Sequence, residues 1–589
     1  MDRKFRRDVE LKNQYVEFMR EYIALSHMSL VTENKLEKPI HFLPHHAVMK
    51  ESSSTTKLRV VFDGSCKTTS NHSLNDILMT DSTIQQDLFS IILRFKQHPY
   101  VITADVAKMY RQINVSDKHR NLQCIVWRFN SDEPISTFRL NTVTYGLASS
   151  PFLAIRSLHQ VALDHKTESP IASQIILRDF YVDDLLTGAD TLEETQAINL
   201  EVTSILQSAG YELRKWTSNS SSIVTAIESS ASEATYEIGE SVKTLGLCWR
   251  PREDQLEYAV CRSQSSQRIT KRTILSTISR IFDPLGLVGP ATIKAKIMLQ
   301  RLWQLNLKWD ESVPLDIYTT WNHYEGQLPH LGNIRIPRLV RTMDAVQTEL
   351  HGFCDASELA YGACLYIRTS TQEGAHTTHL LCAKSRVAPL KKISLPRLAL
   401  CGALLLSKLI HQVRQALTIP FKEVFCWSDS TITLAWIKGE PHRWKTFVAN
   451  RVTEIQQLSQ QSNWNHVISE DNPADIISRG CDPIDLRDSE LWWTGPTWLS
   501  RDSSHWPQQT QQHSEVIPEL RQPHVIFAHV NQSCQLFDRF SSLNRLQRVL
   551  AYCLRWKTIV KDRNIVTSGH LTVAELDKSL KVLIKLMQS

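Results

Sequence analysis

The chain of 589 residues has no long apolar run, and the residues that follow Met1 are mostly charged or polar. A membrane-spanning helix needs about 20 consecutive apolar residues, and a secretory signal needs an apolar core behind a basic start. Neither pattern is present. The sequence therefore predicts a protein with no membrane span and no secretory leader.

Cysteine is present, but never in the spacing of a metal site. The 12 cysteines are scattered, with no C-x-x-C pair and no Cys/His cluster at zinc-finger spacing. This predicts reduced thiols in an intracellular protein, either cytoplasmic or nuclear, and it argues against structural zinc. His45 and His46 have no matching second pair of ligands, so we expect a structural or backbone-contacting role for them rather than metal binding.

The composition is that of a globular protein, with 42% hydrophobic and 22% charged residues. A chain of this length exceeds the size of one hydrophobic core, so we expect several domains. The net charge of +6 permits binding to nucleic acid but does not require it.

Strand-like and helical segments alternate along the chain, which predicts a multidomain protein of α/β and α+β class. We expect a helix at 82–98 behind a Ser/Thr cap, and strands at 58–63 and 100–106. The pattern divides the chain into an N-terminal helical segment, a mixed α/β domain, a basic helical region, a second α/β domain, and a linker followed by helices: 1–40, 41–265, 266–345, 346–485 and 486–589.

Two adjacent carboxylates, Asp183 and Asp184, lie between apolar residues in what reads as a buried hairpin. Held about 4 Å apart at an effective dielectric constant near 20, two such charges repel by about 4 kcal/mol. The pair is therefore either a solvated turn or a site that expects a cation.

A third carboxylate, Asp105, ends an apolar strand and is followed by Tyr110. An acid at a strand end together with two acids at a hairpin tip is an arrangement that holds two divalent cations on a triphosphate and a 3′-hydroxyl. The three acids therefore favour a metal site over a solvated turn.

Several ordered motifs carry a resemblance to a known family. ADVAKMY (104–110), TYGLASSPFLA (144–154) and YVDD (181–184) resemble the palm motifs of a reverse transcriptase. KLRVVFDGS, GYELRKWTSN, LGLCW and FDPLGLVGP are similar in particular to BEL/Pao-class LTR retrotransposon polyproteins. The resemblance covers nearly the whole chain. It implies a right-hand polymerase, with fingers and palm in 41–265 and a thumb or connection in 266–345.

The family pattern implies a role for each matching residue. Asp105, Asp183 and Asp184 would bind two Mg²⁺ ions, with a primer–template of RNA and DNA and deoxynucleoside triphosphates as substrates. Tyr110 matches the residue that excludes a 2′-hydroxyl, with a core aromatic as the alternative reading. The other matches are Gly146 against the template–nucleotide pair, Lys57 and Arg59 on the incoming phosphates, and Lys215, which resembles a lysine proposed to protonate pyrophosphate, with a surface lysine as the alternative.

Two further groups of residues allow more than one reading. The segment 267–282 places Arg268, Lys271, Arg272 and Arg280 in a helical pattern, which suits a solvated face or contact with the primer–template backbone. Three tryptophans near the end of the second α/β domain are expected to anchor the linker onto that domain rather than to stack on bases: Trp492, Trp493 and Trp498.

A second set of acids, Asp355, Asp429 and Asp475, follows apolar strands or lies in a polar loop. In this order they resemble ribonuclease H, which implies metal binding and a ribonuclease H-like domain at 346–485. The family pattern has a glutamate where this chain has Ala399. The loss of one ligand predicts that this domain folds but cuts the RNA of a hybrid poorly or not at all.

Two functions are consistent with these motifs. The first is an RNA-directed DNA polymerase, and the second is a catalytically inactive nucleic-acid-binding remnant or co-opted retroelement protein. Region 486–589 resembles the segment that precedes integrase, and protease and integrase motifs are absent, so we expect the interior of a polyprotein. The sequence says nothing of the oligomeric state.

Overall fold

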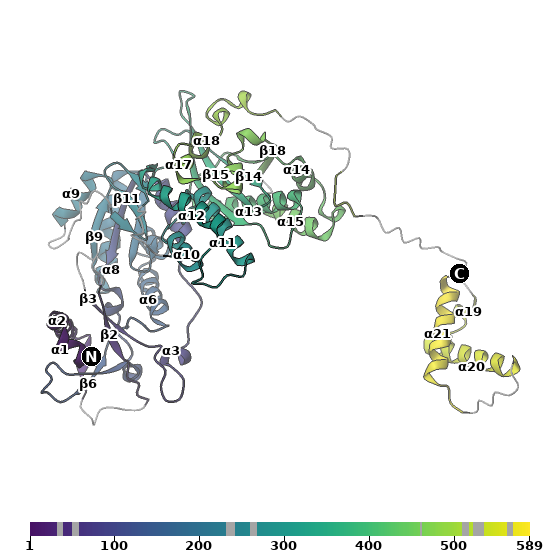
Figure 1. The fold of residues 1–589 in the computed structure, drawn as a ribbon, viewed down its shortest axis with the longest axis horizontal. Coiled ribbons are helices and arrows are strands. Elements are labelled where there is room, and N and C mark those ends of the chain that lie inside the picture. The colour runs from purple at the N-terminus through teal and green to yellow at the C-terminus, as the bar shows by residue number, and fades with distance from the viewer. Residues whose placement is uncertain are drawn as a thin grey trace. The chain divides into compact units, whose positions relative to one another are not determined.

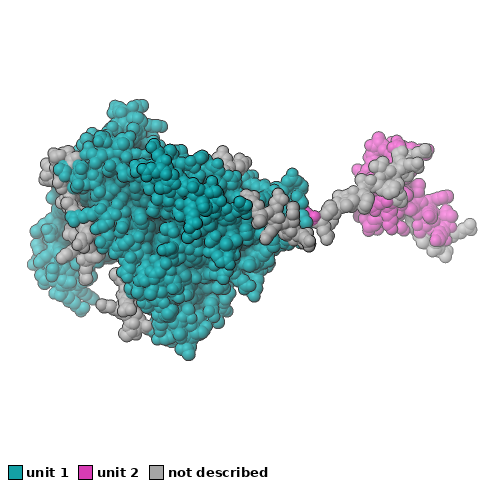
Figure 2. All heavy atoms as spheres, turned by 90° about the horizontal axis from the view of Figure 1, so that it is seen from above, with its two compact units in different colours: residues 1–520 teal, residues 521–589 magenta. Residues whose placement is uncertain are grey.

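The computed structural model describes residues 1–31, 39–49, 58–230, 242–258, 268–459, 462–508, 517–521, 535–561 and 569–588. Two compact units, residues 1–520 and 521–589 (Figure 1), are coloured separately in Figure 2. Within the described parts of the chain, no helix combines the length and apolarity that crossing a membrane requires.

The N-terminal helices α1 (Asp2–Arg7) and α2 (Val9–Ala24) pack against two small sheets. One sheet has the order β1–β6–β5, and the other is the antiparallel pair β2–β3. Tyr15 of α2 is fully buried, and its hydroxyl lies 2.5 Å from Nδ1 of His45. His45 therefore has the structural role expected from the sequence. The strands are β1 (Met28–Leu30), β2 (His45–Met49), β3 (Leu58–Phe62), β5 (Cys124–Trp127) and β6 (Ser136–Leu140).

The central sheet of the polymerase-like part is antiparallel, with the order β7–β8–β4–β9. Because side chains alternate between the faces of a strand, Ile102 and Ala104 of β4 point into the core formed with the helices, whereas Val101 belongs to a different core. The strands are β4 (Tyr100–Val106), β7 (Phe180–Tyr181), β8 (Asp184–Ala189) and β9 (Leu213–Ser218), and the helices are α6 (Ser150–Asp164), α7 (Pro170–Arg178) and α8 (Leu192–Ser208).

The helix predicted at 82–98 is shorter than expected. Helix α4 spans Leu88–Gln97, and its N-cap is Asp87, whose side chain accepts a hydrogen bond from the amide of Ser90 at 2.9 Å. Aspartate caps a helix as well as serine or threonine does, so the first possible cap in the sequence was not the one used. The residues before Asp87 are thereby left as a loop, which carries Gln85.

A small four-stranded sheet, β10–β11–β12–β13, and three helices follow the palm-like part. β10 and β11 form a hairpin whose two turn residues, Leu245 and Gly246, both have positive φ, as a two-residue hairpin turn requires. The bounds are β10 (Val242–Thr244), β11 (Leu247–Arg250), β12 (Gln255–Glu257), β13 (Ile336–Pro337), α10 (Lys271–Ser279), α11 (Gly289–Gln304) and α12 (Leu315–Gln327).

The next part of the chain is a mixed five-stranded sheet with the order β16–β15–β14–β17–β18. The first three strands are antiparallel, and β14, β17 and β18 are parallel. The elements are β14 (Gln347–Ala356), β15 (Ala360–Ser370), β16 (His376–Val387), α13 (Leu395–Ala416), β17 (Val424–Ser428), α14 (Thr431–Lys438), α15 (Thr446–Leu458), β18 (Ser462–His466) and α16 (Pro473–Arg479).

The tryptophan-rich stretch that follows is packed onto this domain. Trp492 in α18 (Glu490–Thr494) is fully buried, and its indole N–H donates to the carbonyl of Leu287 at 2.8 Å. The indole N–H of Trp498 donates to Asp471 at 3.1 Å. Trp498 therefore anchors the stretch on this domain as expected, whereas the indole N–H of Trp492 bonds to the preceding 266–345 region.

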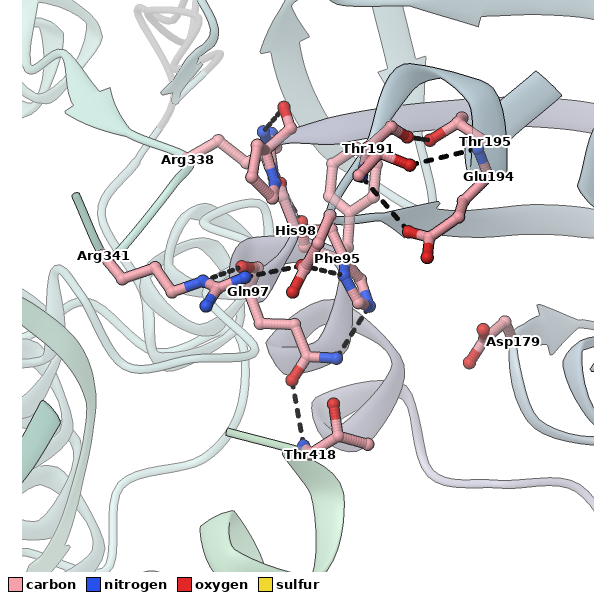
Figure 3. A network of polar contacts seen from close by, with 12 residues as sticks. Phe95, Gln97, His98, Asp179, Thr191, Glu194, Thr195, Arg338, Arg341 and Thr418 are labelled. Atoms are coloured by element: carbon pink, nitrogen blue, oxygen red, sulfur yellow. Dashed lines mark hydrogen bonds and ion pairs between the residues drawn. The ribbon is translucent and has the colours of Figure 1, made fainter. Parts of the chain in front are cut away.

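Arg338 joins the end of α4 to the connecting segment (Figure 3). Its side chain is fully buried and donates to the carbonyls of Phe95 at 2.5 Å and His98 at 2.8 Å, which are groups that the end of a helix leaves without partners. Nearby, Oε1 of Gln97 accepts a hydrogen bond from the amide of Thr418 at 3.0 Å. The polymerase-like and ribonuclease H-like parts are thus held in one unit by α4.

The second unit contains α19 (Gln535–Asp538), α20 (Leu543–Lys561) and α21 (Val573–Gln588). α20 and α21 pack against each other, with Leu546, Ala551 and Leu583 buried. The helical pattern expected for the end of the chain is therefore present.

Candidate active sites

Asp105 and Asp184 face each other across two antiparallel strands. Asp105 lies near the end of β4 and pairs in register with Asp184, the first residue of β8. Directly opposite residues place their side chains on the same face of a sheet. Ala104 and Leu185, their neighbours, point into the helical core, so the two carboxylates lie on the opposite face.

Asp183 belongs to the tight turn between β7 and β8. Val182, the residue before it, has φ of 57°, a left-handed conformation that is strained for a β-branched side chain. The backbone amide of Val182 donates to Oε1 of Gln85 at 3.0 Å. The turn is thereby connected to the loop before α4. Nothing in the sequence around Gln85 marks this contact, which depends on the tertiary structure.

The three carboxylates repel one another. Burial, Asp183 and Asp105 together raise the pKa of Asp184 to about 7. Burial and the charge of Asp105 also raise the pKa of Asp183, although Arg59 and Lys215 oppose this. The cation in direct contact is Lys215, whose Nζ lies 3.1 Å from Oδ2 of Asp105. The cluster of three carboxylates therefore carries an excess of negative charge, which a bound cation would stabilise.

The donor set suits a hard divalent cation, because all three side chains supply carboxylate oxygen. Within the described residues, no three His, Cys, Asp or Glu side chains form a complete metal cage by themselves. Mg²⁺ is commonly bound by one or two carboxylates together with substrate phosphates, rather than by a cage made entirely of protein ligands. The acidic face therefore fits a metal site that substrate completes.

Lys215 lies in β9 and has φ of 54°. It is 39% exposed on its side chain and forms the ion pair with Asp105, so it is neither remote from the acids nor fully buried. Its position next to Asp105 follows from the pairing of β4 with β9, in which Asp105 is opposite Arg214. The structure thus brings Lys215 to the predicted site.

Tyr110 is close to the acids and to a second tyrosine. It lies in a short 3₁₀ helix, Met109–Gln112, with its ring 4.8 Å from that of Tyr145. Burial and the charge of Asp183 raise its pKa, and Asp183 acts in the same direction on Tyr145. The structure therefore places a half-buried aromatic pair beside the carboxylates, although Tyr110 also packs against the hydrophobic core of the palm-like part.

Gly146 occupies a place where no side chain fits. A Cβ atom at this residue would lie 1.9 Å from the carbonyl oxygen of Phe62, and its φ is 96°. Phe62 ends β3, so Gly146 allows the segment 144–148 to approach that strand closely. The reason for glycine here is the backbone of β3, and the sequence motif alone did not reveal it.

Of the two residues expected to bind the incoming phosphates, Arg59 is among the described residues and Lys57 is not. Arg59 is an exposed residue of β3, opposite Val48, and its charge acts on both Asp183 and Tyr145. The geometry therefore brings Arg59 into the electrostatic surroundings of the acids.

The basic run expected in the thumb does not form a uniform cationic face. Lys271 is 3% exposed, donates to the carbonyl of Leu307 at 2.7 Å and lies 4.1 Å from the ring of Trp303. Arg272 forms an ion pair with Asp310 at 2.6 Å. Lys271 is thus neither a solvated residue nor a phosphate contact, because its ammonium group is bonded internally.

The second set of acids converges at the end of the mixed sheet. Asp355 follows Cys354 in β14 and Asp429 follows Ser428 in β17, and Cys354 pairs with Ser428 in parallel register. The two carboxylates therefore leave adjacent parallel strands at the same edge. Burial and the charge of Asp429 raise the pKa of Asp355, while Oγ of Ser478 donates to its Oδ2 at 2.6 Å.

Asp475 joins this cluster from α16. Burial raises its pKa; Arg479, 2.6 Å away, opposes that effect, and the charge of Asp355 adds to it. Oγ of Ser469 donates to Oδ2 of Asp429 at 2.9 Å. Ser478 of α16 and Ser469, which bond two of the three acids, were not identified from the sequence, because a serine in a short polar segment carries no distinguishing pattern.

Ala399 lies on α13, which packs against β14 and β15. It is 6% exposed and packs with Ala356, the neighbour of Asp355, and with Leu398. Gly402, one turn further on, is so close to β14 that a Cβ atom would lie 3.0 Å from the carbonyl oxygen of Asp355. Position 399 is therefore on the helix that packs against the end of β14, and its side chain is a methyl group in contact with Ala356.

Two families match the chain. Residues 48–222 match the family described as reverse transcriptase (RNA-dependent DNA polymerase). Residues 270–430 match the Pao retrotransposon-like RNaseH-like domain, a range that includes Asp355, Ala399 and Asp429 but not Asp475. Among curated proteins, none matches in sequence.

Solved structures of similar fold come from foamy virus. The protease-reverse transcriptase dRH in complex with double-stranded DNA has 15% identity, a TM-score of 0.49 and coverage of 76% of this chain and 68% of that one. The protease-reverse transcriptase with double-stranded DNA has 15% identity, a TM-score of 0.46 and coverage of 78% and 83%. The protein with an RNA/DNA hybrid has 16% identity, a TM-score of 0.42 and coverage of 74% and 51%, so the chain spans about half of its length.

The first matched family gives the class: residues 48–222 form a reverse transcriptase domain, an RNA-directed DNA polymerase. The ribonuclease H-like domain that follows it is of the Pao type. The chain therefore combines a reverse transcriptase region with a ribonuclease H-like domain of the Pao retrotransposon type.

Proposed function

We propose that this chain extends a DNA primer on an RNA or DNA template by nucleotidyl transfer at Asp105, Asp183 and Asp184. The observation that carries the proposal is the register of β4 and β8, which places Asp105 opposite Asp184 with Asp183 at the adjoining turn. The substrates are a primer–template and deoxynucleoside triphosphates.

The acids of this site would hold Mg²⁺. When bound, two such ions would lower the pKa of the primer hydroxyl and stabilise the charge of the leaving pyrophosphate. The carboxylates themselves do not transfer protons in this scheme. Burial and, after it, mutual repulsion raise the pKa of Asp183 and of Asp184, and a bound cation would stabilise the charged carboxylates.

Other residues bind and orient the nucleotide. Arg59, with Lys57, supplies positive charge for the incoming phosphates. Tyr110, held against Tyr145, is the side chain that a ribose 2′-hydroxyl would meet. Gly146 lets its segment pack closely on β3, and that backbone would lie against the template–nucleotide pair. Lys215 is an ammonium group already within 3.1 Å of Asp105, and it gives its proton to the pyrophosphate leaving group.

The ribonuclease H-like domain retains Asp355, Asp429 and Asp475, which would be its metal ligands, but not a fourth carboxylate. Ala399 supplies a methyl group beside Ala356 where the family pattern has glutamate. We propose that this domain holds the hybrid but cleaves its RNA weakly or not at all, because a two-metal site with one ligand fewer has lost about one unit of negative charge.

Primer extension tests the polymerase. Wild type is compared with Asp183→Asn, which keeps the size of the side chain and removes its charge. Extension by the wild type that the variant abolishes supports the proposal, and absence of extension by either protein supports the inactive remnant instead. Thermal stabilisation by Mg²⁺ in the wild type, reduced in Asp105→Asn, provides a readout of metal binding that does not depend on activity.

The remnant is the second candidate because of one observation. The fourth carboxylate of the ribonuclease H-like cluster is missing at Ala399, which shows that one of the two acidic sites departs from its family pattern. The three acids of the palm-like part show no such departure, so the polymerase remains the function that the geometry supports best.

A further inference from the structure

The positive charge of this chain is concentrated at its end. Residues 521–589 contain 11 Lys and Arg and 4 Asp and Glu, a net charge of +7. The whole chain, with 67 basic and 61 acidic residues, carries +6, so residues 1–520 have 56 against 57 and a net charge of −1. The second compact unit therefore accounts for the entire basic character of the protein.

This second unit is folded, so its charges are presented on fixed helices. Arg555 of α20 forms an ion pair with Glu575 of α21 at 2.5 Å, and it also donates to the carbonyls of Gly569 and His570. Glu575 in turn accepts a hydrogen bond from the amide of Thr572, at the start of α21, at 2.8 Å. The two helices are thus joined at their connection.

The outward face of α21 carries a row of lysines. Lys578, Lys581 and Lys585 follow one another at a spacing of three and four residues, which places them on one side of the helix. All three are exposed, whereas Ser579 and Leu583 on the other side are buried. The row is therefore directed to solvent and not into the helix pair.

α20 adds four exposed basic residues to this unit, and the acids of α20 and α21 do not cancel them. Glu575 is engaged by Arg555, and Asp577 is engaged by Lys581 at 2.7 Å. Among the described residues, the other basic side chains of the two helices have no ion pair: Arg545, Arg548, Lys557, Lys561, Lys578 and Lys585. The unit thus presents uncompensated positive charge.

We propose that the unit formed by α20 and α21 is a second nucleic-acid-binding surface, which holds the phosphate backbone of an RNA–DNA or DNA duplex without regard to sequence. Phosphates are the polyanion that rows of unpaired Lys and Arg bind, with release of counterions. Because the polymerase-containing unit has no net positive charge, this surface supplies a large part of the salt-dependent affinity of the full chain.

A stripe of apolar residues on α20 favours a different partner for this unit. Val549, Tyr552, Trp556 and Val560 share one face and are 41%, 52%, 70% and 59% exposed. An exposed apolar stripe also suits contact with a second copy of the chain. The charge of the unit favours nucleic acid, because +7 on each of two copies would repel.

The test uses the full chain and a fluorescently labelled RNA–DNA duplex, with the dissociation constant measured over a range of salt concentrations. The test variant combines Arg545→Gln, Arg548→Gln, Lys578→Gln and Lys585→Gln, which leaves the Arg555–Glu575 pair intact. The control combines four exposed basic residues of the first unit: Arg7→Gln, Lys118→Gln, Lys166→Gln and Lys308→Gln. Circular dichroism checks that each variant keeps its helices.

We expect the test variant to bind roughly tenfold more weakly near physiological salt, and its slope of log affinity against log salt to fall by roughly 0.9 for every residue that contacts a phosphate. The control should retain the wild-type slope. Equal affinity and slope in the wild type and the test variant, or an equal loss in the control, would overturn the proposal. The proposal would also be overturned if Val549→Ser/Trp556→Ser lowered the oligomeric mass of the protein while the charge variant bound the duplex normally. That result would show that the unit contacts a second copy of the chain.

The proposed binding surface lies outside the polymerase site, so the test of the surface and the test of the polymerase can fail separately. Asp183→Asn should stop primer extension but keep the wild-type salt slope, because it leaves α20 and α21 unchanged. Absence of extension by the wild type would count against the polymerase alone, since the slope measurement requires no turnover.

Discussion

Gln85 and Val182 are joined by a hydrogen bond of 3.0 Å, in which the side-chain oxygen of Gln85 accepts from the backbone amide of the strained residue in the YVDD turn. The contact connects the loop before α4 to the residue that precedes Asp183. A left-handed conformation costs a β-branched residue about 1–2 kcal/mol or more, so it persists only where its surroundings fix it. Gln85 is thus a positioning residue for the acidic turn.

Gln85→Leu should lower kcat for primer extension by about tenfold or more, with a smaller change in KM, because the turn loses its acceptor and Asp183 loses its position. Single-turnover extension would measure the effect. Val182→Gly in the same background should restore part of the rate, because glycine adopts positive φ without strain. Gln86→Leu is the matched control, since Gln86 is an exposed neighbour. A rate in Gln85→Leu equal to that of the control would refute this role.

Gly146→Ala should destabilise the protein severely, by roughly 3 kcal/mol or more, because the new methyl group would lie 1.9 Å from the carbonyl oxygen of Phe62. Gly210 provides a comparison, because it too has positive φ, of 82°, but a Cβ atom there would meet no neighbour within 4 Å. Gly210→Ala should cost only the conformational strain of about 1–2 kcal/mol. Urea unfolding followed by tryptophan fluorescence measures both, and similar costs would contradict the steric explanation.

Tyr110→Ala should allow ribonucleotides to be incorporated, because the side chain expected to meet a 2′-hydroxyl is removed. The ratio of kcat/KM for a deoxynucleotide to that for the matching ribonucleotide should fall by at least about tenfold. Tyr145→Phe, in the ring 4.8 Å away, should preserve the ratio. If discrimination survives in Tyr110→Ala, Tyr110 is a core aromatic and not a selectivity residue.

Ala399→Glu should increase cleavage of the RNA strand of a hybrid by at least about tenfold, because it restores the carboxylate that the family pattern has at this position. Ala399→Gln is the control, since it has the same size and no charge. The assay is the release of short RNA fragments from a labelled hybrid. Robust cleavage by the wild type, unchanged in Ala399→Glu, would show that three acids suffice.

Lys96 should make the stability of the first unit depend on pH. It is fully buried, and burial and the charge of Arg338 lower its pKa to about 7. Between about pH 7 and the pKa near 10.4 of an unfolded lysine, the folded protein binds fewer protons, so stability rises with pH by at most roughly 1.4 kcal/mol per pH unit. Lys96→Met should remove this rise and raise the unfolding midpoint most at pH 7. Parallel pH profiles of the two proteins would contradict the assignment.

Local pattern was sufficient to predict much of the palm-like part. The alternation of apolar residues in 100–106 indicated the strand β4, and Asp105 could be placed near its end. The helix before it was predicted too long, because the cap at Asp87 competes with earlier serine and threonine residues and sequence alone does not rank them. The roles assigned to the acids, to Lys57, Arg59, Tyr110, Gly146 and Lys215 and to the ribonuclease H-like set remain predictions.

The sequence by itself determined the family, the order of the acidic motifs and the absence of a glutamate at position 399, because each of these is written in local residue types. Only the tertiary structure decided that Asp105 faces Asp184, that Gln85 holds Val182, and that Lys271 is turned inward. These contacts join residues far apart in the chain, and they depend on strand register and packing, which follow from the burial of many side chains together and not from any one segment.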